Sequence, residues 1–176
     1  MSLPQSIAAV GVFVNHDVSE IVDLVADCGL TMVQLHGDES PEVLAELQAR
    51  LRTVPIIRAW RMGTDLADWQ AYLAECQRLH VDLAGCLIDA QITGQFGGTG
   101  RRPSWDVLKS CYRRESWPPL ILAGGLTADN VADAIRTLQP WGVDVASGVE
   151  SSLGVKDLDR VARFIAAARG STSTSA

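Results

Sequence analysis

The residues that could do chemistry stand where short apolar runs end. Asp89 closes the run CLID at 86–89, and His36 closes the run MVQLH at 32–36. Polar side chains at the carboxyl ends of parallel strands lie where α/β proteins place their active or ligand-binding sites. Strand alternation would place Gln34 on the face of His36 and turn Cys86 away from the face of Asp89. Simpler roles remain open, because Asp89 could cap a helix or turn and His36 could complete a core hydrogen bond.

Two later runs end in small residues that expose the backbone. Gly124 and Gly125 follow the run at 120–123, and Ser147 and Gly148 follow the run at 143–146. Glycine lets backbone N–H groups approach an anion, and a helix N-terminus behind the loop adds positive potential. Either pair could serve a tight turn alone, but two pairs in consecutive units favour a phosphate site. The sequence has no GxGxxG motif, so a dinucleotide fingerprint is not supported.

The elements that must position these residues alternate in type along the chain. Apolar runs predict strands at 10–14, 32–36, 56–60, 86–89, 120–123 and 143–146. Amphipathic stretches predict helices at 19–26, from 41 to about 51, and at 65–79, 105–111, 129–138 and 157–168. About six β–α units predict a parallel α/β fold, either an open doubly wound sheet or a closed (β/α)8 barrel. Polar groups and glycines at several strand ends favour the TIM barrel, because its active-site face collects those ends.

Composition narrows the classes of function further. The formal net charge of −6 argues against a general nucleic-acid-binding protein. No apolar run approaches the roughly 18 residues of a membrane span. The four cysteines form no CxxC pair and the three histidines are scattered, so we expect no metal and no cofactor. We therefore expect a cytoplasmic protein with reduced thiols, one domain over 1–169 and a disordered tail over 170–176.

Several segments, taken in order, resemble phosphoribosylanthranilate isomerase, a TIM-barrel enzyme of tryptophan biosynthesis. They are VQLHG at 33–37, GGTG at 97–100, LAGGL at 122–126 with Asn130, and VDVASGVE at 143–150 followed by GVKD at 154–157. The resemblance implies an Amadori rearrangement of N-(5-phosphoribosyl)anthranilate to 1-(2-carboxyphenylamino)-1-deoxyribulose 5-phosphate. It also implies a phosphorylated small-molecule substrate.

The resemblance assigns roles to named residues. It implies that Asp89 is the general acid that protonates the ribose ring oxygen and opens the ring to a Schiff base. The chemistry needs a carboxyl group that is protonated when it acts, and burial favours that form. The resemblance also implies that substrate or phosphate is bound by a set of residues in the other matching segments, which are Gly124, Gly125, Ser147, Gly148, Gln34, His36 and Asp144.

The sequence also departs from the family pattern. The family's first two β–α units have no counterpart here, which predicts a barrel N-terminally truncated to about six units. Those units carry a Lys-Ile-Cys-Gly type motif, whose cysteine is the general base, and an arginine beside the substrate. The run RRPSW at 101–105 replaces the usual Lys-x-Phe-Asp-Trp. We expect the true start to lie upstream of Met1. The alternatives are a second copy or partner chain at open sheet edges, or a catalytically inactive fragment that binds phosphate ligands or completes a barrel.

Overall fold

The computed structural model describes residues 4, 6–63, 65–89 and 103–170. The predicted loop at 97–100 and residues 171–176 lie outside these ranges. The chain divides into two compact units, one of Met1–Trp60 with Ala67–Cys86 and the other of Arg61–Leu66 with Leu87–Ala176. The boundary between the units crosses two strands, and each unit is described by itself.

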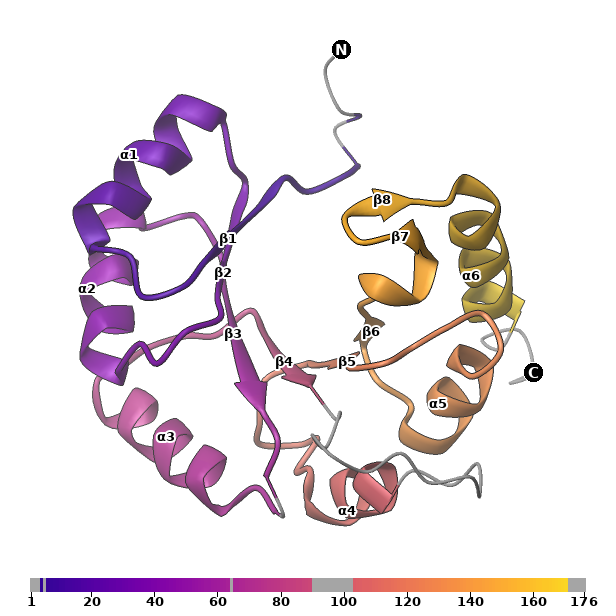
Figure 1. Ribbon diagram of the computed structural model, residues 1–176. Coiled ribbons are helices and arrows are strands. Elements are labelled where there is room, and N and C mark those ends of the chain that lie inside the picture. The colour runs from indigo at the N-terminus through magenta and orange to yellow at the C-terminus, as the bar shows by residue number, and fades with distance from the viewer. Residues whose placement is uncertain (1–3, 5, 64, 90–102, 171–176) are drawn as a thin grey trace. The chain divides into compact units, whose positions relative to one another are not determined.

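The first unit alternates strands and helices. In chain order its elements are β1 (Val10–Phe13), α1 (Val18–Cys28), β2 (Met32–Leu35), α2 (Pro41–Leu51), β3 (Ile56–Arg61), α3 (Ala67–Arg78) and the first residues of β4 (Gly85–Asp89). The strands are parallel, with Phe13 opposite Leu35 and Leu35 opposite Arg58. Figure 1 shows α1, α2 and α3 along one side of β1, β2 and β3. The carboxyl ends of the three strands therefore lie at one edge.

The core of the first unit lies between its strands and helices. Its fully buried side chains come from alternate strand positions and from the inner faces of α1 and α2; among them are Ile21, Val33, Leu35, Leu44, Leu47 and Ile56. Each such side chain contributes about 1.5–3 kcal/mol when it leaves water. Because Val33 and Leu35 face the helices, Gln34 and His36 are carried on the opposite face of the sheet.

Local signals explain where the first helices begin and end. Pro41 occupies the first turn of α2, where its missing N–H costs no hydrogen bond. Gly29 ends α1 in the left-handed conformation, at φ 61°, and its N–H donates to the carbonyl of Ala26. These ends agree with the helix positions predicted from sequence, to within a few residues.

The second unit continues the alternation and then adds a hairpin. After the last residues of β4 come α4 (Pro103–Cys111), β5 (Leu120–Ala123), α5 (Val131–Leu138), β6 (Gly142–Val143), the 3-10 turn η1 (Ser147–Val149), β7 (Glu150–Ser152), β8 (Val155–Lys156) and α6 (Leu158–Gly170). In this unit β5 and β6 are parallel, with Leu122 opposite Val143. Figure 1 shows α4, α5 and α6 following one another beside these strands.

The parallel α/β architecture predicted from the sequence is confirmed. Hydrogen-bonded strands follow one another in chain order from β1 to β6. The sequence missed the antiparallel hairpin of β7 and β8, and it made the last parallel strand too long, because only Gly142 and Val143 form β6. Helix α6 includes Gly170, the residue at which we had expected the tail to begin.

Strand β1 carries exposed apolar side chains. Val10 and Val12 lie on one face of β1, Val14 directly follows the strand, and the three side chains are 40%, 57% and 55% exposed. Strand β1 is first in the sheet order, so β2 is its one hydrogen-bonded neighbour among the strands that the structure describes. This edge is therefore open in the described part of the chain.

Candidate functional site

Asp89 ends strand β4 and is its least buried residue. Gly85, Cys86, Leu87 and Ile88 are all buried, whereas Asp89 is half-buried. Its backbone carbonyl accepts a hydrogen bond from the N–H of Met62, at 3.2 Å. The apolar strand fixes the backbone, and the half-buried end leaves the carboxyl group able to reach a ligand. This is the placement that a proton-donating side chain needs.

Cys86 lies three residues before Asp89, on the opposite face of β4. It is 0% exposed. Strand alternation predicted that Cys86 would face away from Asp89, and its complete burial keeps the thiol away from solvent. Cys86 is therefore not a candidate for the catalytic base.

The loop after β5 depends on two adjacent glycines. Gly124 and Gly125 have φ angles of 95° and 61°, a region that side chains with a Cβ rarely adopt. Asn130 braces the loop from the start of α5. Its side-chain amide donates to the carbonyl of Gly125, at 3.1 Å, and its Oδ1 accepts the N–H of Thr127, at 2.9 Å. The loop is therefore held in a conformation that only glycine adopts easily.

The loop after β6 contacts the loop after β5 directly. A Cβ atom added at Gly148 would lie 1.9 Å from the carbonyl oxygen of Leu126, which follows the glycine pair. Only a residue without a side chain permits this approach. The structure thus brings together two of the predicted segments, Gly124–Gly125 and Ser147–Gly148, within the second unit.

Asp144 stands directly after β6. Its backbone N–H donates to the carbonyl of Leu122, at 2.8 Å, which extends the pairing of β5 with β6 by one step. Its side chain is exposed. Asp89, the two glycine loops and Asp144 therefore all follow neighbouring parallel strands at the carboxyl end.

Gln34 and His36 form a pair in the first unit. The side-chain amide of Gln34 donates to Nδ1 of His36, at 3.2 Å. A neutral imidazole that accepts at Nδ1 carries its proton on Nε2, so Nε2 is the nitrogen that can donate to a ligand. The backbone N–H of His36 donates to the carbonyl of Phe13, at 2.8 Å, which ties it to the end of β1.

A buried ion pair that was not predicted from the sequence lies at the same edge of the first unit. Nη1 of Arg58 lies 3.3 Å from Oε2 of Glu39, and their side chains are only 3% and 2% exposed. The carboxylate also accepts the backbone N–H groups of Asn15, at 2.8 Å, and Gly37, at 2.9 Å. The available signal was a cation inside the apolar strand run at 56–60, which a solvated charge would not explain.

Arg58 joins the loops that surround this pair. Its guanidinium donates to the carbonyls of Leu35, at 3.0 Å, and Gly37, at 2.9 Å, and to the hydroxyl of Tyr72, at 3.2 Å. It also lies over the rings of Trp60 and Tyr72, 5.7 and 5.3 Å from their centres. Burial raises the pKa of Tyr72 to about 12, so this phenol is a neutral hydrogen-bonding group at physiological pH.

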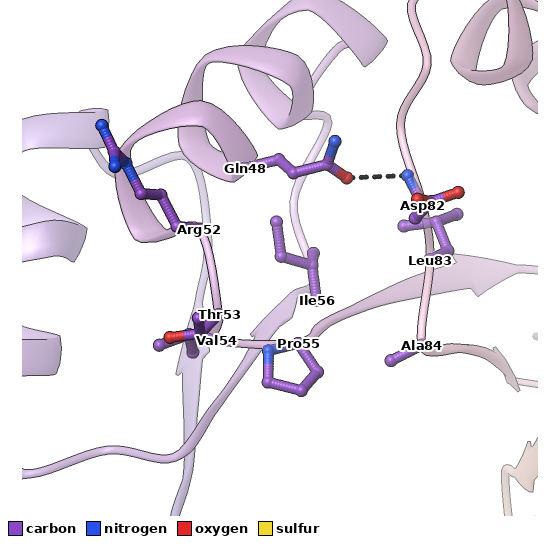
Figure 2. Close-up of a pocket in the computed structure, with 9 residues that line it drawn as sticks. All are labelled: Gln48, Arg52, Thr53, Val54, Pro55, Ile56, Asp82, Leu83 and Ala84. Atoms are coloured by element: carbon purple, nitrogen blue, oxygen red, sulfur yellow. Dashed lines mark hydrogen bonds between the residues drawn. The ribbon is translucent and has the colours of Figure 1, made fainter.

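A pocket of about 350 Å³ lies at the opposite, amino end of β3 and β4. Figure 2 shows it between the end of α2, where Gln48 lies on the helix and Arg52 directly follows it, and the segment before β4 that carries Asp82. Gln48 Oε1 accepts the N–H of Asp82, at 2.7 Å. None of the residues predicted to bind substrate lines this pocket, so it is not the candidate site.

Metal sites and membrane spans are both absent from the residues that the structure describes. No group of three or more histidine, cysteine, aspartate or glutamate side chains in that part of the chain could hold a metal ion. None of the helices described is both long enough and apolar enough to cross a membrane.

Parallel strands in chain order, flanked by helices and ending in polar or glycine-rich loops, define an α/β-barrel type of protein. Solved structures agree. The phosphoribosyl anthranilate isomerase of Thermotoga maritima matches with a TM-score of 0.78 and 31% identity, over 96% of this chain and 76% of that chain. A phosphoribosyl anthranilate isomerase in complex with reduced 1-(o-carboxyphenylamino)-1-deoxyribulose 5-phosphate matches with a TM-score of 0.75 and 31% identity, over 96% and 74%.

Sequence comparison gives the particular family. The family model for N-(5'-phosphoribosyl)anthranilate (PRA) isomerase matches residues 2–167. The N-(5'-phosphoribosyl)anthranilate isomerase of Roseiflexus castenholzii is 46% identical over 94% of this chain and 72% of that protein, and that of Trichlorobacter lovleyi is 40% identical over 93% and 73%. The chain belongs to the N-(5'-phosphoribosyl)anthranilate isomerase family.

Proposed function

We propose that the protein isomerises N-(5-phosphoribosyl)anthranilate to 1-(2-carboxyphenylamino)-1-deoxyribulose 5-phosphate, a step of tryptophan biosynthesis. The observation that carries this proposal is that Asp89 ends β4, while two touching loops that contain glycine follow β5 and β6, the next strands in the sheet order. Family membership over residues 2–167 supports it, as does the ribulose phosphate held by a related enzyme.

Asp89 acts as the general acid in this proposal. Its carboxyl proton goes to the ribose ring oxygen while the bond between that oxygen and C1 breaks, which leaves a Schiff base at C1. The proton on C2 then passes to a general base other than Asp89, a role for which the resemblance implies a cysteine. The electrons of the C2–H bond form the C1=C2 bond of the enolamine, which tautomerises to the 2-ketone. A positioned acid of this kind contributes about 10²–10⁴-fold to the rate.

The two glycine loops bind the phosphate in this proposal. We assign the phosphate to Gly124, Gly125, Ser147 and Gly148, because glycine has no side chain to keep an anion from the backbone N–H groups and the side chain of Ser147 is small. Backbone N–H groups arranged in this way bind anions in many proteins. The loops after the last strands are also the usual phosphate site of a TIM barrel.

The remaining predicted residues contact other parts of the substrate. Asp144 follows β6 in the second unit, and its exposed carboxylate can accept a hydroxyl proton in a hydrogen bond. Gln34 and His36 are proposed as substrate contacts because the first unit presents them at the carboxyl end of β2, on the face away from its helices.

We further propose a cytoplasmic enzyme whose open sheet edge pairs with a second copy or a partner chain. The exposed valines of β1 support this pairing, because an unpaired apolar strand edge is a template for another strand. Size-exclusion chromatography tests it. Elution at more than 18.9 kDa is expected, and a monomer at micromolar concentration would contradict the pairing.

The activity is tested by following C2 of the ¹³C-labelled ribose, which changes from an alcohol to a ketone carbon. The parent chain should convert it, and Asp89→Asn should lose about 10²–10⁴-fold in rate with an unchanged circular dichroism spectrum. Asp106→Asn, on the exposed side of α4, is the matched control and should keep the parent rate. Full turnover by Asp89→Asn would remove Asp89 as the acid. A parent chain that neither converts nor binds the substrate would contradict the function itself.

A further inference from the structure

The segment GVKD at 154–157 connects the hairpin of β7 and β8 to α6, and the proposed reaction assigns it no role. Gly154 turns the hairpin at φ 76°, and the pairing of β7 with β8 sets Lys156 opposite Glu150. Asp157 directly precedes α6, and its Oδ1 accepts the N–H of Arg160, at 3.0 Å. The hairpin therefore holds Lys156 in a fixed position just before α6.

Lys156 binds the residue that precedes the proposed phosphate loop. Its Nζ donates to the carbonyl of Ala146 and to Oε1 of Glu150, each at 2.8 Å. The N–H of Val149 points to the same carbonyl of Ala146, at 3.5 Å. Lys156 and the 3-10 turn thus share one acceptor, and the ammonium group lies at the entry to that turn.

The other end of the turn is held by the same elements. The N–H of Asp157 donates to the carbonyl of Val149, at 2.8 Å, and the guanidinium of Arg160 donates to the carbonyl of Glu150. The side chain of Glu150 is 14% exposed and that of Lys156 is 46% exposed. The turn at 147–149 is therefore fastened at both ends by the hairpin and by α6.

The carbonyl of Ala146 and the N–H of Ser147 belong to one planar peptide unit. In a trans peptide these two groups point in opposite directions, so fixing the carbonyl also fixes the N–H. The amide of Ser147 is one of the donors that the proposed function assigns to the phosphate. A bond from Lys156 to Ala146 therefore acts on the phosphate site without Lys156 touching the phosphate.

We infer that Lys156, held in place by Glu150, is a positioning residue that orients the backbone N–H of Ser147 for phosphate binding. This inference rests on the proposed function, because it assumes that Ser147 and Gly148 bind the phosphate. Lys156 sets the direction of the peptide between Ala146 and Ser147, and Glu150 keeps the ammonium group against that peptide.

Two other roles of Lys156 predict different results. A direct electrostatic role would bring its ammonium charge to the phosphate, and removing the neighbouring carboxylate of Glu150 would then strengthen binding. A merely superficial ion pair would contribute little, as exposed pairs usually do. Orientation through Glu150 predicts instead that Glu150→Gln weakens phosphate binding, although the substitution removes a negative charge near an anion.

The test is an NMR titration of the ¹⁵N-labelled full chain with inorganic phosphate, read at the amides of Ser147 and Gly148. Lys156→Met should weaken binding by about tenfold or more, as expected for a lost hydrogen bond from a charged donor. Glu150→Gln should weaken it in the same direction, and Lys156→Arg should restore most of it. Arg136→Met, which removes a cation from an exposed pair on α5, is the control and should bind as the parent does.

Ligand-free spectra separate this inference from the phosphate site itself. Lys156→Met should shift the Ser147 amide and speed its hydrogen exchange without any phosphate present. An unchanged Ser147 amide in Lys156→Met, or tighter phosphate binding by Glu150→Gln, would overturn the positioning role. A different result would separate the two claims: phosphate leaves the Ser147 and Gly148 amide shifts of the parent unchanged, while Lys156→Met still shifts them. That result would contradict the proposed phosphate site but would support the orienting contact of Lys156.

Discussion

Gly148 and Leu126 are in backbone contact, with no room for a Cβ atom at position 148. The space that a Cβ would fill lies 1.9 Å from the carbonyl oxygen of Leu126. The loop after β6 therefore rests on the loop after β5, and the conformation of one constrains the other. Two phosphate-binding loops built in this way would act as one unit.

Gly148→Ala should force these two loops apart. Overpacking of this kind costs about 1–3 kcal/mol of stability, and the displaced N–H groups should also bind phosphate more weakly. The checks are urea denaturation and the phosphate titration. Gly63→Ala is the matched control, because a Cβ at Gly63 meets nothing within 4 Å. Unchanged stability and unchanged phosphate affinity in Gly148→Ala would show that the loops do not touch in solution.

Arg58→Met should be among the most destabilising changes in the first unit. It leaves the carboxylate of Glu39 buried without its cation, and the loss of one partner from a buried pair costs about 3–5 kcal/mol. Urea denaturation followed by circular dichroism measures this loss.

Arg78→Met provides the comparison for Arg58→Met. Arg78 pairs with Glu75 on α3, in the same unit, but both side chains are largely exposed. The free energy of unfolding of Arg78→Met should stay close to that of the parent, because solvent screens exposed pairs. Equal decreases in the free energy of unfolding in Arg58→Met and Arg78→Met would contradict the buried network around Glu39.

Three of the four thiols should react with iodoacetamide in a fixed order. Cys28 is exposed on α1 and should react first, whereas Cys76 and Cys86 are buried and should react only after unfolding. Burial raises the pKa of Cys76 to about 11, so its reactive thiolate is scarce even at mildly alkaline pH. Mass spectrometry of the alkylated peptides reads the order, and Cys28→Ser should remove the fastest phase. Rapid labelling of Cys76 in the folded protein would show that α3 opens readily.

The ion pair between Glu150 and Lys156 should break only at acidic pH. The hydrogen bond from Lys156, followed by that from the Gly154 backbone, lowers the pKa of Glu150 from its ordinary 4.5. Because the folded pKa lies below the unfolded one, the stabilisation is complete above about 4.5 and is lost as the pH falls through the lowered value. The chemical shift of the Ser147 amide should therefore stay constant as the pH falls to about 4.5, and it should change at lower pH. Glu150→Gln should abolish the movement, and a transition near neutral pH would be inconsistent with this assignment.

The sequence predicted the parallel alternation well because each strand is a short apolar run and each helix has an apolar face. The run LILA at 120–123 became β5 with the expected bounds, and Pro41 and Gly29 marked helix ends. The hairpin of β7 and β8 was harder to predict. Strands β7 and β8 are only three and two residues long, and polar residues such as Ser151 and Lys156 give them no apolar pattern.

The candidate site could be predicted only where a local pattern points to it. A polar residue at the end of an apolar strand indicated Asp89 and His36, and paired glycines indicated the two loops. Glu39 and Arg58 could not be paired from sequence, because they lie 19 positions apart and meet through the register of β2 with β3. Charged residues are usually solvated, so a pair this deeply buried needed coordinates to be found.

The exposed valines at the β1 edge also affect how the protein behaves during purification. Val10, Val12 and Val14 form an exposed apolar patch at the edge of the described sheet, and such patches promote adsorption and self-association. Dilute stocks and a mild solubilising additive should therefore preserve usable material during purification and freezing, whereas concentrating the sample would promote precipitation.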